Sequence, residues 1–223
     1  MTEELWNSVD DYLTEVLVAP DDALNAALLS ADKAGLPAIN VSPPAGKLLY
    51  LMARAIGARN ILEIGTLAGY STIWLARALA PGGKLISLEA DAKHADLARA
   101  NIARAGLANV VDVRLGRALE ILPQIAAEKR EPFDFIFIDA DKESIPDYFQ
   151  WSLRLGQRGS LILVDNVIRR GRVIDAQCDD DAIRGVRKFN TMVAAEPRVT
   201  ATAMQTVGCK GYDGFAVALI TAD

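Results

Sequence analysis

Acidic and amide side chains follow two apolar runs that are typical of buried strands. The run from Phe133 to Ile138 leads into Asp139, and the run from Leu161 to Val164 leads into Asp165 and Asn166. Ligands of open parallel sheets bind at the carboxyl ends of the strands, so we expect these three side chains to lie close together. Carboxylate and amide oxygens are hard ligands that suit Mg²⁺, with Mn²⁺ or Ca²⁺ as alternatives. This set favours a divalent cation site, although a single strand-end aspartate more often caps a helix or turns the chain.

Lys142 comes three residues after Asp139 and adds a proton acceptor to the same place. A cation at this edge would acidify and orient a bound hydroxyl, and a partly buried lysine beside it could take the proton. Two neighbouring hydroxyls on one ring can chelate a cation, so a vicinal diol is the natural acceptor. The alternative for Lys142 is a surface lysine on a turn. The single histidine, His94, falls in a charged helical run and is interpreted as a solvated helix residue.

A second place for a ligand is a glycine turn. A β-prone run, Ile61 to Ile64, leads into Gly65 and Gly69, and a helical pattern follows at once. Glycine allows a positive φ and a close approach to the main chain, and the first N–H groups of the helix face outward. Glu89 comes 20 residues after Gly69, at the end of the next strand-like run, where an acid suits a ribose diol. The spacing differs from dinucleotide and P-loop motifs, and such turns also occur for packing alone.

Composition limits the class of protein. The 223 residues fit one domain, and 51% hydrophobic residues can fill a sizeable core without any apolar run long enough for a membrane span. A net charge of −5 argues against a nucleic acid substrate, so a small molecule is the expected partner. The start is acidic and resembles no signal peptide, which predicts a cytoplasmic protein. Cys178 and Cys209 form no C-x-x-C motif and are expected to be free thiols.

The elements that position these residues alternate strand and helix along most of the chain, which predicts a parallel sheet covered on both faces. The expected strands and the helices that follow them are, in order, 61–64, 84–89 and 92–105, 110–115 and 118–129, 133–139 and 144–155, 160–165 and 181–195. Two last strands, 199–207 and 215–221, are separated by only seven residues and should pair as an antiparallel hairpin. Ser42 and Pro43 predict a helix start, with Leu48, Leu49, Met52 and Ile56 buried.

Residues 1–40 form a helical extension before the first strand. Residues 2–18 carry an apolar stripe with a helical spacing, and a second helix runs from Asp21 or Asp22 to a stop at Gly35. The stripe consists of Trp6, Val9, Leu13 and Val16. An apolar stripe needs a partner, so this extension is expected to form a lid or the contact face of a homodimer.

Taken together, these motifs resemble a known family. Glu63-x-Gly65-x-x-x-Gly69 with Glu89 is similar to motif I and its acidic partner in class I S-adenosylmethionine-dependent methyltransferases. The stretches 137–142 and 164–167 resemble the cation-dependent O-methyltransferases, which include the catechol and caffeoyl-CoA enzymes. The resemblance covers nearly the whole chain from Val41 onward. It implies a single Rossmann-like α/β domain over residues 1–223, with a seven-stranded, mostly parallel sheet of order 3-2-1-4-5-7-6 whose last strand is antiparallel.

The resemblance also implies residue roles. Asp139, Asp165 and Asn166 would hold the divalent cation, and Lys142 would be the base. The residues expected around S-adenosylmethionine are Val41, Glu63, Gly65, Thr66, Ser71, Glu89, Ala118 and Asp139. The chain departs from the catechol enzymes at Ala140, where they carry a histidine.

The expected function is methyl transfer from S-adenosylmethionine to a hydroxyl of a small, catechol-like aromatic acceptor. The alternatives are a nicotinamide-dependent dehydrogenase and a non-catalytic module that binds S-adenosylmethionine. Arg169, Arg170 and Arg172 follow the cation loop and could meet an anionic part of the acceptor, such as a carboxylate or a CoA phosphate, or simply lie in a solvated loop.

Overall fold

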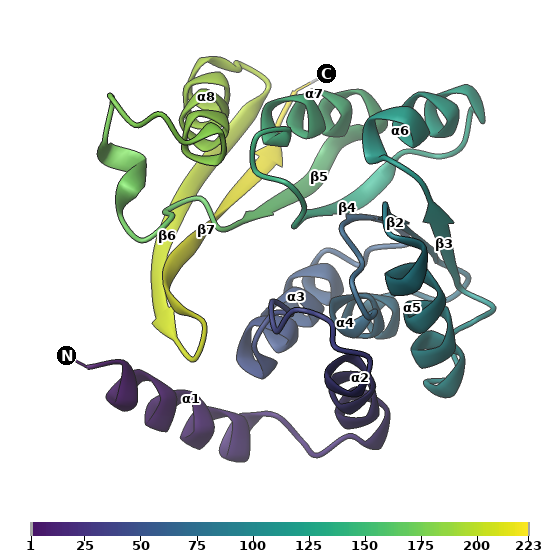
Figure 1. The fold of residues 1–223 in the computed structure, drawn as a ribbon. Helices are drawn as coiled ribbons and strands as arrows, with labels where there is room; N and C mark the ends of the chain where they lie inside the picture. Colours follow the sequence, from purple (N-terminus) through teal and green to yellow (C-terminus); the bar gives the residue numbers. More distant parts are fainter. Residues whose placement is uncertain (1, 223) are drawn as a thin grey trace.

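The computed structural model describes residues 2–222 as one seven-stranded sheet between two layers of helices (Figure 1). The strands are β1 (Asn60–Ile64), β2 (Lys84–Glu89), β3 (Val111–Leu115), β4 (Phe133–Ile138), β5 (Gly156–Asp165), β6 (Val199–Gly208) and β7 (Gly211–Ile220). Their order is β3-β2-β1-β4-β5-β7-β6, and β7 pairs antiparallel with both neighbours while the strands from β3 to β5 pair in parallel. The predicted fold class, strand order and antiparallel last strand are confirmed.

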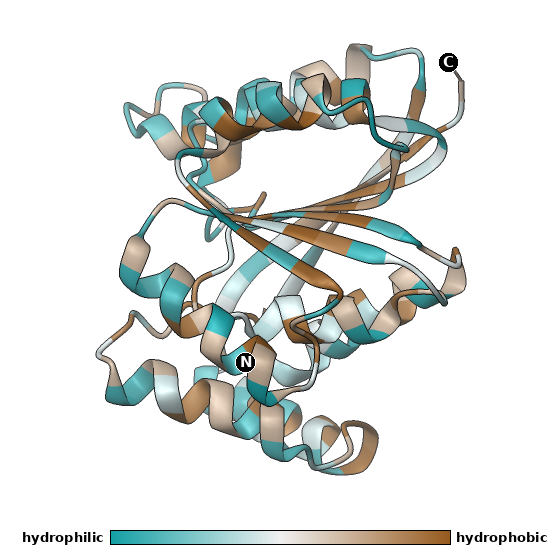
Figure 2. Ribbon diagram, turned by 90° about the vertical axis from the view of Figure 1, so that its right-hand side faces the viewer, coloured by the Kyte–Doolittle hydropathy of each residue, from teal (hydrophilic) through white to brown (hydrophobic). Residues whose placement is uncertain are grey.

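Helices cover both faces of this sheet. They are α1 (Glu3–Leu17), α2 (Asp22–Lys33), α3 (Pro43–Ala55), α4 (Tyr70–Ala78), α5 (Ala92–Arg104), α6 (Ala118–Ala127), α7 (Ile145–Leu155) and α8 (Asp181–Ala195), with a short 3₁₀ turn, η1 (Arg172–Ile174). Figure 2 shows the apolar strands between the two helical layers. None of the described helices is long and apolar enough to cross a membrane.

Alternation along the central strand β4 divides the core into two clusters. Ile136 and Ile138 pack into one cluster, which includes residues of α6, α7 and α8. Phe135 and Phe137 pack into the other, which includes residues of α2 to α5. A strand covered on both faces is apolar at nearly every position. The apolar run Phe133–Ile138 therefore predicts a buried strand from the sequence.

Two expected boundaries near the carboxyl terminus are wrong. The hairpin loop consists of Cys209 and Lys210 alone, because β7 begins at Gly211 rather than at Phe215. Gly211 and Gly214 both lie within the ladder, and a Cβ at position 214 would overlap the Met204 carbonyl. Strand β5 likewise begins at Gly156 rather than at Ser160, with a register shift against β4.

Two expected apolar faces are only partly buried. In α3, Leu49 is buried and Leu48 and Met52 are half-buried, but Ile56 is 39% exposed because it lies just past the end of the helix.

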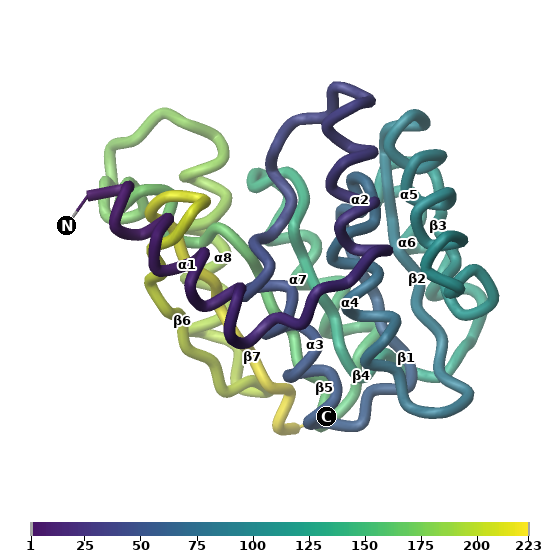
Figure 3. The backbone as a smooth tube through the Cα atoms, turned by 90° about the horizontal axis from the view of Figure 1, so that it is seen from below, coloured from purple at the N-terminus to yellow at the C-terminus, as the bar shows by residue number. Residues whose placement is uncertain are grey.

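In α1, Trp6 and Leu13 are half-buried, whereas Val9 and Val16 are 46% and 53% exposed. Figure 3 shows α1 crossing the β6–β7 hairpin, where the Asp10 carboxylate accepts a hydrogen bond of 2.8 Å from the Cys209 N–H.

Candidate active site

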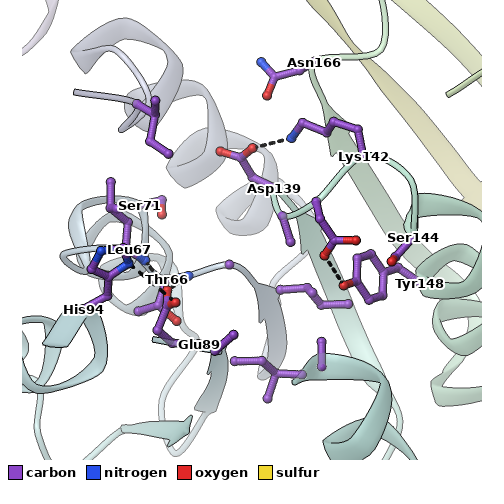
Figure 4. A pocket seen from close by; sticks show the side chains of 18 of the residues that line it. Thr66, Leu67, Ser71, Glu89, His94, Asp139, Lys142, Ser144, Tyr148 and Asn166 are labelled. Atoms are coloured by element: carbon purple, nitrogen blue, oxygen red, sulfur yellow. Dashed lines mark hydrogen bonds and ion pairs between the residues drawn. The ribbon is translucent and has the colours of Figure 1, made fainter. Parts of the chain in front are cut away.

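A cavity of about 740 Å³ lies at the carboxyl ends of the central strands (Figure 4). It brings together most of the site residues expected from the sequence. Those in its wall are Val41, Gly65, Thr66, Ser71, Glu89, Ala118, Asp139, Lys142 and Asn166. Two expected residues, Glu63 and Asp165, lie outside the lining. Of the extension, the described residues that line the cavity are Ile39 and Asn40, which follow α2, so neither α1 nor α2 lines it.

The glycine turn brings two strand ends together. Gly65 has a φ of +99°, and a Cβ there would overlap the Asp139 carbonyl at the end of β4. Gly69, with a φ of +82°, is the N-cap of α4. A positive φ and the lack of a side chain are both required at position 65, so no other residue fits without moving the Asp139 backbone.

Glu89 closes the turn from the neighbouring strand. Its Oε2 accepts hydrogen bonds from the Thr66 N–H at 3.2 Å and the Leu67 N–H at 2.7 Å, and its Oε1 accepts one from the Asp91 N–H at 3.0 Å. The N–H groups of Thr66 and Leu67, which precede α4 in the turn, are thus already bound to the carboxylate. Glu89 therefore holds the turn in shape while its carboxylate remains in the cavity wall.

His94 also lines the cavity, which differs from its interpretation as a solvated helix residue. Its Nδ1 lies 3.7 Å from Glu89 Oε1, and the residue is half-buried instead of solvated. The local reason is the start of α5, where Asp91 Oδ1 accepts hydrogen bonds from the Lys93 and His94 N–H groups. The first turn of this helix thus directs the imidazole toward Glu89, and the only sequence signal is that both residues flank the same helix start.

Glu63 lies behind the wall and is fully buried. Its carboxylate accepts hydrogen bonds from the hydroxyls of Ser71 at 2.6 Å and Ser87 at 2.6 Å, and from that of Thr72. Burial raises the pKa of Glu63 to about 7, although the three hydroxyl donors partly oppose this shift. Ser71 reaches the cavity from the other side, so it links the buried carboxyl to the ligand space.

The predicted cation ligands and Lys142 are neighbours in space. The Lys142 ammonium donates a hydrogen bond of 2.8 Å to Asp139 Oδ1, and its side chain is only 10% exposed. Figure 4 shows this pair beside Asn166, across the cavity from the glycine turn. Burial raises the pKa of Asp165 to about 7, with a further rise from the charge of Asp139 and an opposing effect of Lys142.

This set is limited to two carboxylates and one amide. Within residues 2–222, no group of three or more His, Cys, Asp and Glu side chains is arranged to hold a metal ion. The Asn166 backbone has a φ of +60°, and Asp165 Oδ1 accepts a hydrogen bond of 2.7 Å from the Asn166 N–H. Non-glycine residues with a positive φ are uncommon and often mark functional sites.

A third part of the wall was not expected from the sequence. The Tyr148 hydroxyl donates a hydrogen bond of 2.5 Å to Asp141 Oδ1, and both residues line the cavity (Figure 4). Burial raises the pKa of Tyr148, and the hydrogen bond to Asp141 raises it further. Tyr148 belongs to the buried stripe of α7, so its sequence position indicates core packing and not a place in the cavity.

Comparison with known proteins agrees with the geometry. A family model described as O-methyltransferase matches residues 21–218. A catechol O-methyltransferase from Niastella koreensis is 53% identical over 99% of this chain and 100% of its own length. The crystal structure of the O-methyltransferase from Bacillus cereus in complex with SAH has a TM-score of 0.98 and 55% identity, covering 99% of this chain and 100% of that one.

The structure of TomG from Streptomyces achromogenes, an O-methyltransferase involved in tomaymycin synthesis that was solved in complex with SAM, has a TM-score of 0.97. It is 49% identical and covers 100% of both chains. Because the family model spans most of the chain and relatives of about half identity span all of it, the chain belongs to the O-methyltransferase family, whose members transfer a methyl group from S-adenosylmethionine to an oxygen.

Proposed function

We propose that the protein methylates one hydroxyl of a small, catechol-like aromatic diol, with help from a divalent cation. The observation that carries this proposal is the pairing of Lys142 with Asp139 at 2.8 Å in the wall of the same cavity that holds the glycine turn. A proton acceptor and a carboxylate thus face the space where a methyl donor and an acceptor would meet. Family membership excludes the dehydrogenase alternative.

The cofactor is assigned to the half of the cavity around the glycine turn. Glu89 offers carboxylate lone pairs to a ribose diol, and Ser71 presents a hydroxyl that already donates to Glu63 and so has free lone pairs for a cationic donor. Gly65 and Thr66 supply main chain, and Val41 and Ala118 supply apolar surface. In this proposal Asp139 stands between the cofactor half and the acceptor half.

The residues at the acceptor end fit a divalent cation. Asp139, Asp165 and Asn166 are oxygen donors at neighbouring strand ends, and burial, together with the nearby charge of Asp139, raises the pKa of Asp165. A divalent cation here would offset both the burial and the mutual repulsion of the two carboxylates. When bound, such a cation acidifies and orients the acceptor hydroxyl.

Lys142 has two states in this proposal. In the structure Nζ donates a hydrogen bond of 2.8 Å to Asp139 Oδ1, and an ammonium has no lone pair with which to take a proton. A cation bound to Asp139 would weaken this hydrogen bond and repel the ammonium, which would favour a neutral Nζ facing the acceptor. After losing one proton to solvent, Lys142 would receive the proton of the hydroxyl that attacks the methyl group, and the methyl donor would leave as S-adenosylhomocysteine.

An acceptor screen with a labelled methyl donor tests the proposal. Catechols, monophenols and aliphatic alcohols are compared with Mg²⁺ present and with excess chelator. We expect label transfer to catechols only, and loss of transfer with chelator. Methyl transfer to monophenols at the same rate would contradict the preference for a diol acceptor. Full activity in excess chelator would contradict the requirement for a divalent cation. Turnover of any acceptor also separates an enzyme from a binding module.

We further propose that the protein works as a homodimer. The side chains of Leu5, Val9, Tyr12 and Val16 are 46–62% exposed and recur at steps of three and four along α1. Next to α1 lies the edge strand β6, where Met204 is 55% exposed. An apolar stripe beside an unpaired strand edge is a surface that proteins commonly cover with another chain.

A further inference from the structure

We propose that Arg169 binds a carboxylate on the acceptor, so that the preferred substrate is a catechol that carries an anionic carboxylate rather than a neutral catechol. This inference rests on the proposed function, because it requires the acceptor to lie at the end of the cavity formed by Asn166 and Lys142. It concerns the class of acceptor and not the methyl transfer itself.

The three arginines that follow Asp165 and Asn166 lie in different surroundings in the structure. Arg169 lines the cavity together with Asn166. Arg170 is exposed and lies outside the lining. Arg172 is also exposed, and its guanidinium bonds to Asp180 Oδ2 at 3.0 Å. The sequence presented three equivalent candidates, but only Arg169 is placed where it can reach an acceptor.

The guanidinium of Arg169 lacks hydrogen-bond acceptors for some of its N–H groups. Its Nε is buried and has no hydrogen-bond partner among residues 2–222. Its Nη1 lies 3.8 Å from Asp213 Oδ2, which is an ion pair beyond hydrogen-bond distance. A guanidinium has five N–H donors, and leaving a buried one without an acceptor costs free energy. Because the Arg169 side chain is 35% exposed and lines the cavity, the accessible part of its guanidinium can gain an acceptor from a ligand there.

The backbone that carries Arg169 is held in place. Asp213 Oδ1 accepts hydrogen bonds from the Ile168 N–H at 3.0 Å and the Arg169 N–H at 2.9 Å. Arg169 itself has a φ of +53°, in the left-handed region that costs energy for a residue with a side chain. A loop fixed to β7 in a strained conformation defines where the guanidinium lies, so little ordering is needed when it binds a ligand.

A carboxylate is the partner that this arrangement favours. The planar fork of arginine matches the two oxygens of a carboxylate. Of the other long basic side chains in the cavity lining, Lys142 is already bonded to Asp139, and Arg117 lies at the start of α6 rather than on the loop that carries Asn166. A polyphosphate tail would need several free basic groups, but the nearby Arg172 is tied to Asp180. One arginine without full partners thus points to one carboxylate.

The test uses two acceptors that differ only in charge. They are 3,4-dihydroxybenzoate and its amide, 3,4-dihydroxybenzamide, each measured with S-adenosylmethionine and Mg²⁺. We expect the wild-type kcat/KM to favour the acid by on the order of 10- to 100-fold, as for a charged hydrogen-bonded pair. Arg169→Met should remove this preference by raising KM for the acid, with the amide little changed. Arg169→Lys should recover part of it.

Arg170→Met is the matched control, because it removes the same charge from an exposed neighbour, and its preference for the acid should equal that of the wild type. Equal kcat/KM for both acceptors in the wild type, or an equal loss for both in Arg169→Met, would overturn the role of Arg169 while leaving the methyltransferase assignment intact. A higher kcat/KM for the CoA thioester of 3,4-dihydroxycinnamate than for the free acid would also overturn it.

A binding measurement keeps the two assignments distinguishable. Calorimetry with the protein loaded with S-adenosylhomocysteine should show tighter binding of the benzoate than of the benzamide, and Arg169→Met should abolish the difference. If neither acceptor is methylated but this difference in binding is found, the proposed reaction fails and the anion site stands. If neither is methylated and neither binds, both proposals fail.

Discussion

The Lys142 ammonium and the Asp139 carboxylate are joined by a hydrogen bond of 2.8 Å at the end of β4, in the wall of the main cavity. The two residues are three positions apart in the sequence, and the lysine side chain is only 10% exposed. One carboxylate thus serves both a candidate base and a candidate cation site. This shared use predicts that cation binding and proton removal depend on each other.

Replacing Lys142 by Ala should lower kcat by roughly 10²- to 10⁴-fold, the usual share of a general base. Binding of S-adenosylmethionine should be little changed, because Lys142 lies at the acceptor end. Single-turnover methyl transfer and calorimetry measure the two effects separately. An unchanged single-turnover rate would mean that another group removes the proton.

Replacing Asp165 by Ala should abolish both the activity and its dependence on added Mg²⁺. Asp165 is one of two carboxylates in the proposed ligand set, so its loss leaves one carboxylate and one amide. Activity is titrated with Mg²⁺ after chelator treatment. Asp175→Ala, an exposed aspartate after η1, is the control and should behave as the wild type. A variant of Asp165 that keeps the normal Mg²⁺ response would contradict the ligand assignment.

Replacing Glu89 by Ala should weaken binding of S-adenosylhomocysteine by about 1.5–3 kcal/mol, the usual worth of a hydrogen bond to a charged acceptor. The loss has two sources, because Glu89 also holds the Thr66 and Leu67 N–H groups. His94→Ala should weaken binding of S-adenosylhomocysteine less. The imidazole lies next to Glu89, at 3.7 Å from its Oε1, and holds no main-chain group of the turn. Calorimetry measures both. If His94→Ala weakens binding more than Glu89→Ala does, the ribose assignment is wrong.

Glu63 should make stability fall as the pH rises. Burial raises its folded pKa from 4.5 to about 7, so the unfolded chain releases the proton first. The free energy of unfolding should therefore decrease between about pH 4.5 and pH 7, by roughly 3 kcal/mol in total, and level off above pH 7. Glu63→Gln cannot titrate and should lack this decrease. Urea denaturation across this range compares the two proteins.

The control for that comparison is Glu131→Gln, because Glu131 is an exposed carboxyl in the loop before β4. Its pH profile should run parallel to that of the wild type. A parallel profile for Glu63→Gln as well would mean that the buried carboxyl is already ionised at low pH.

Replacing Val9 by Glu should shift the protein from dimer to monomer. The new charge would be buried in the proposed contact between subunits, among the exposed apolar side chains Leu5, Tyr12 and Val16 of α1. Asn7→Glu places the same charge on an exposed polar position of the same helix and should leave the dimer intact. Light scattering coupled to size-exclusion chromatography measures the mass of each. A wild-type monomer at micromolar concentration would refute the dimer outright.

Local sequence was sufficient for the architecture. A run such as Phe133–Ile138 is apolar throughout because β4 is covered on both faces, and the positive φ at Gly65 and Gly69 requires glycine. Asp139, Asp165 and Asn166 come together because parallel strands place their carboxyl ends at one edge. These features follow from hydrophobic periodicity and strand direction, and both are set by residues that are close together in the sequence.

Tertiary packing decided the details that have no local signal. The predicted start of β7 at Phe215 is wrong because the reason for a glycine at position 214, the approach of Met204, lies on another strand. His94 enters the cavity because the start of α5 directs it to Glu89. Among three neighbouring arginines, Arg169 alone lines the cavity, since Asp213 on β7 fixes its backbone. Each outcome depends on contacts between residues far apart in the chain, and these exist only once the sheet and its helices have packed.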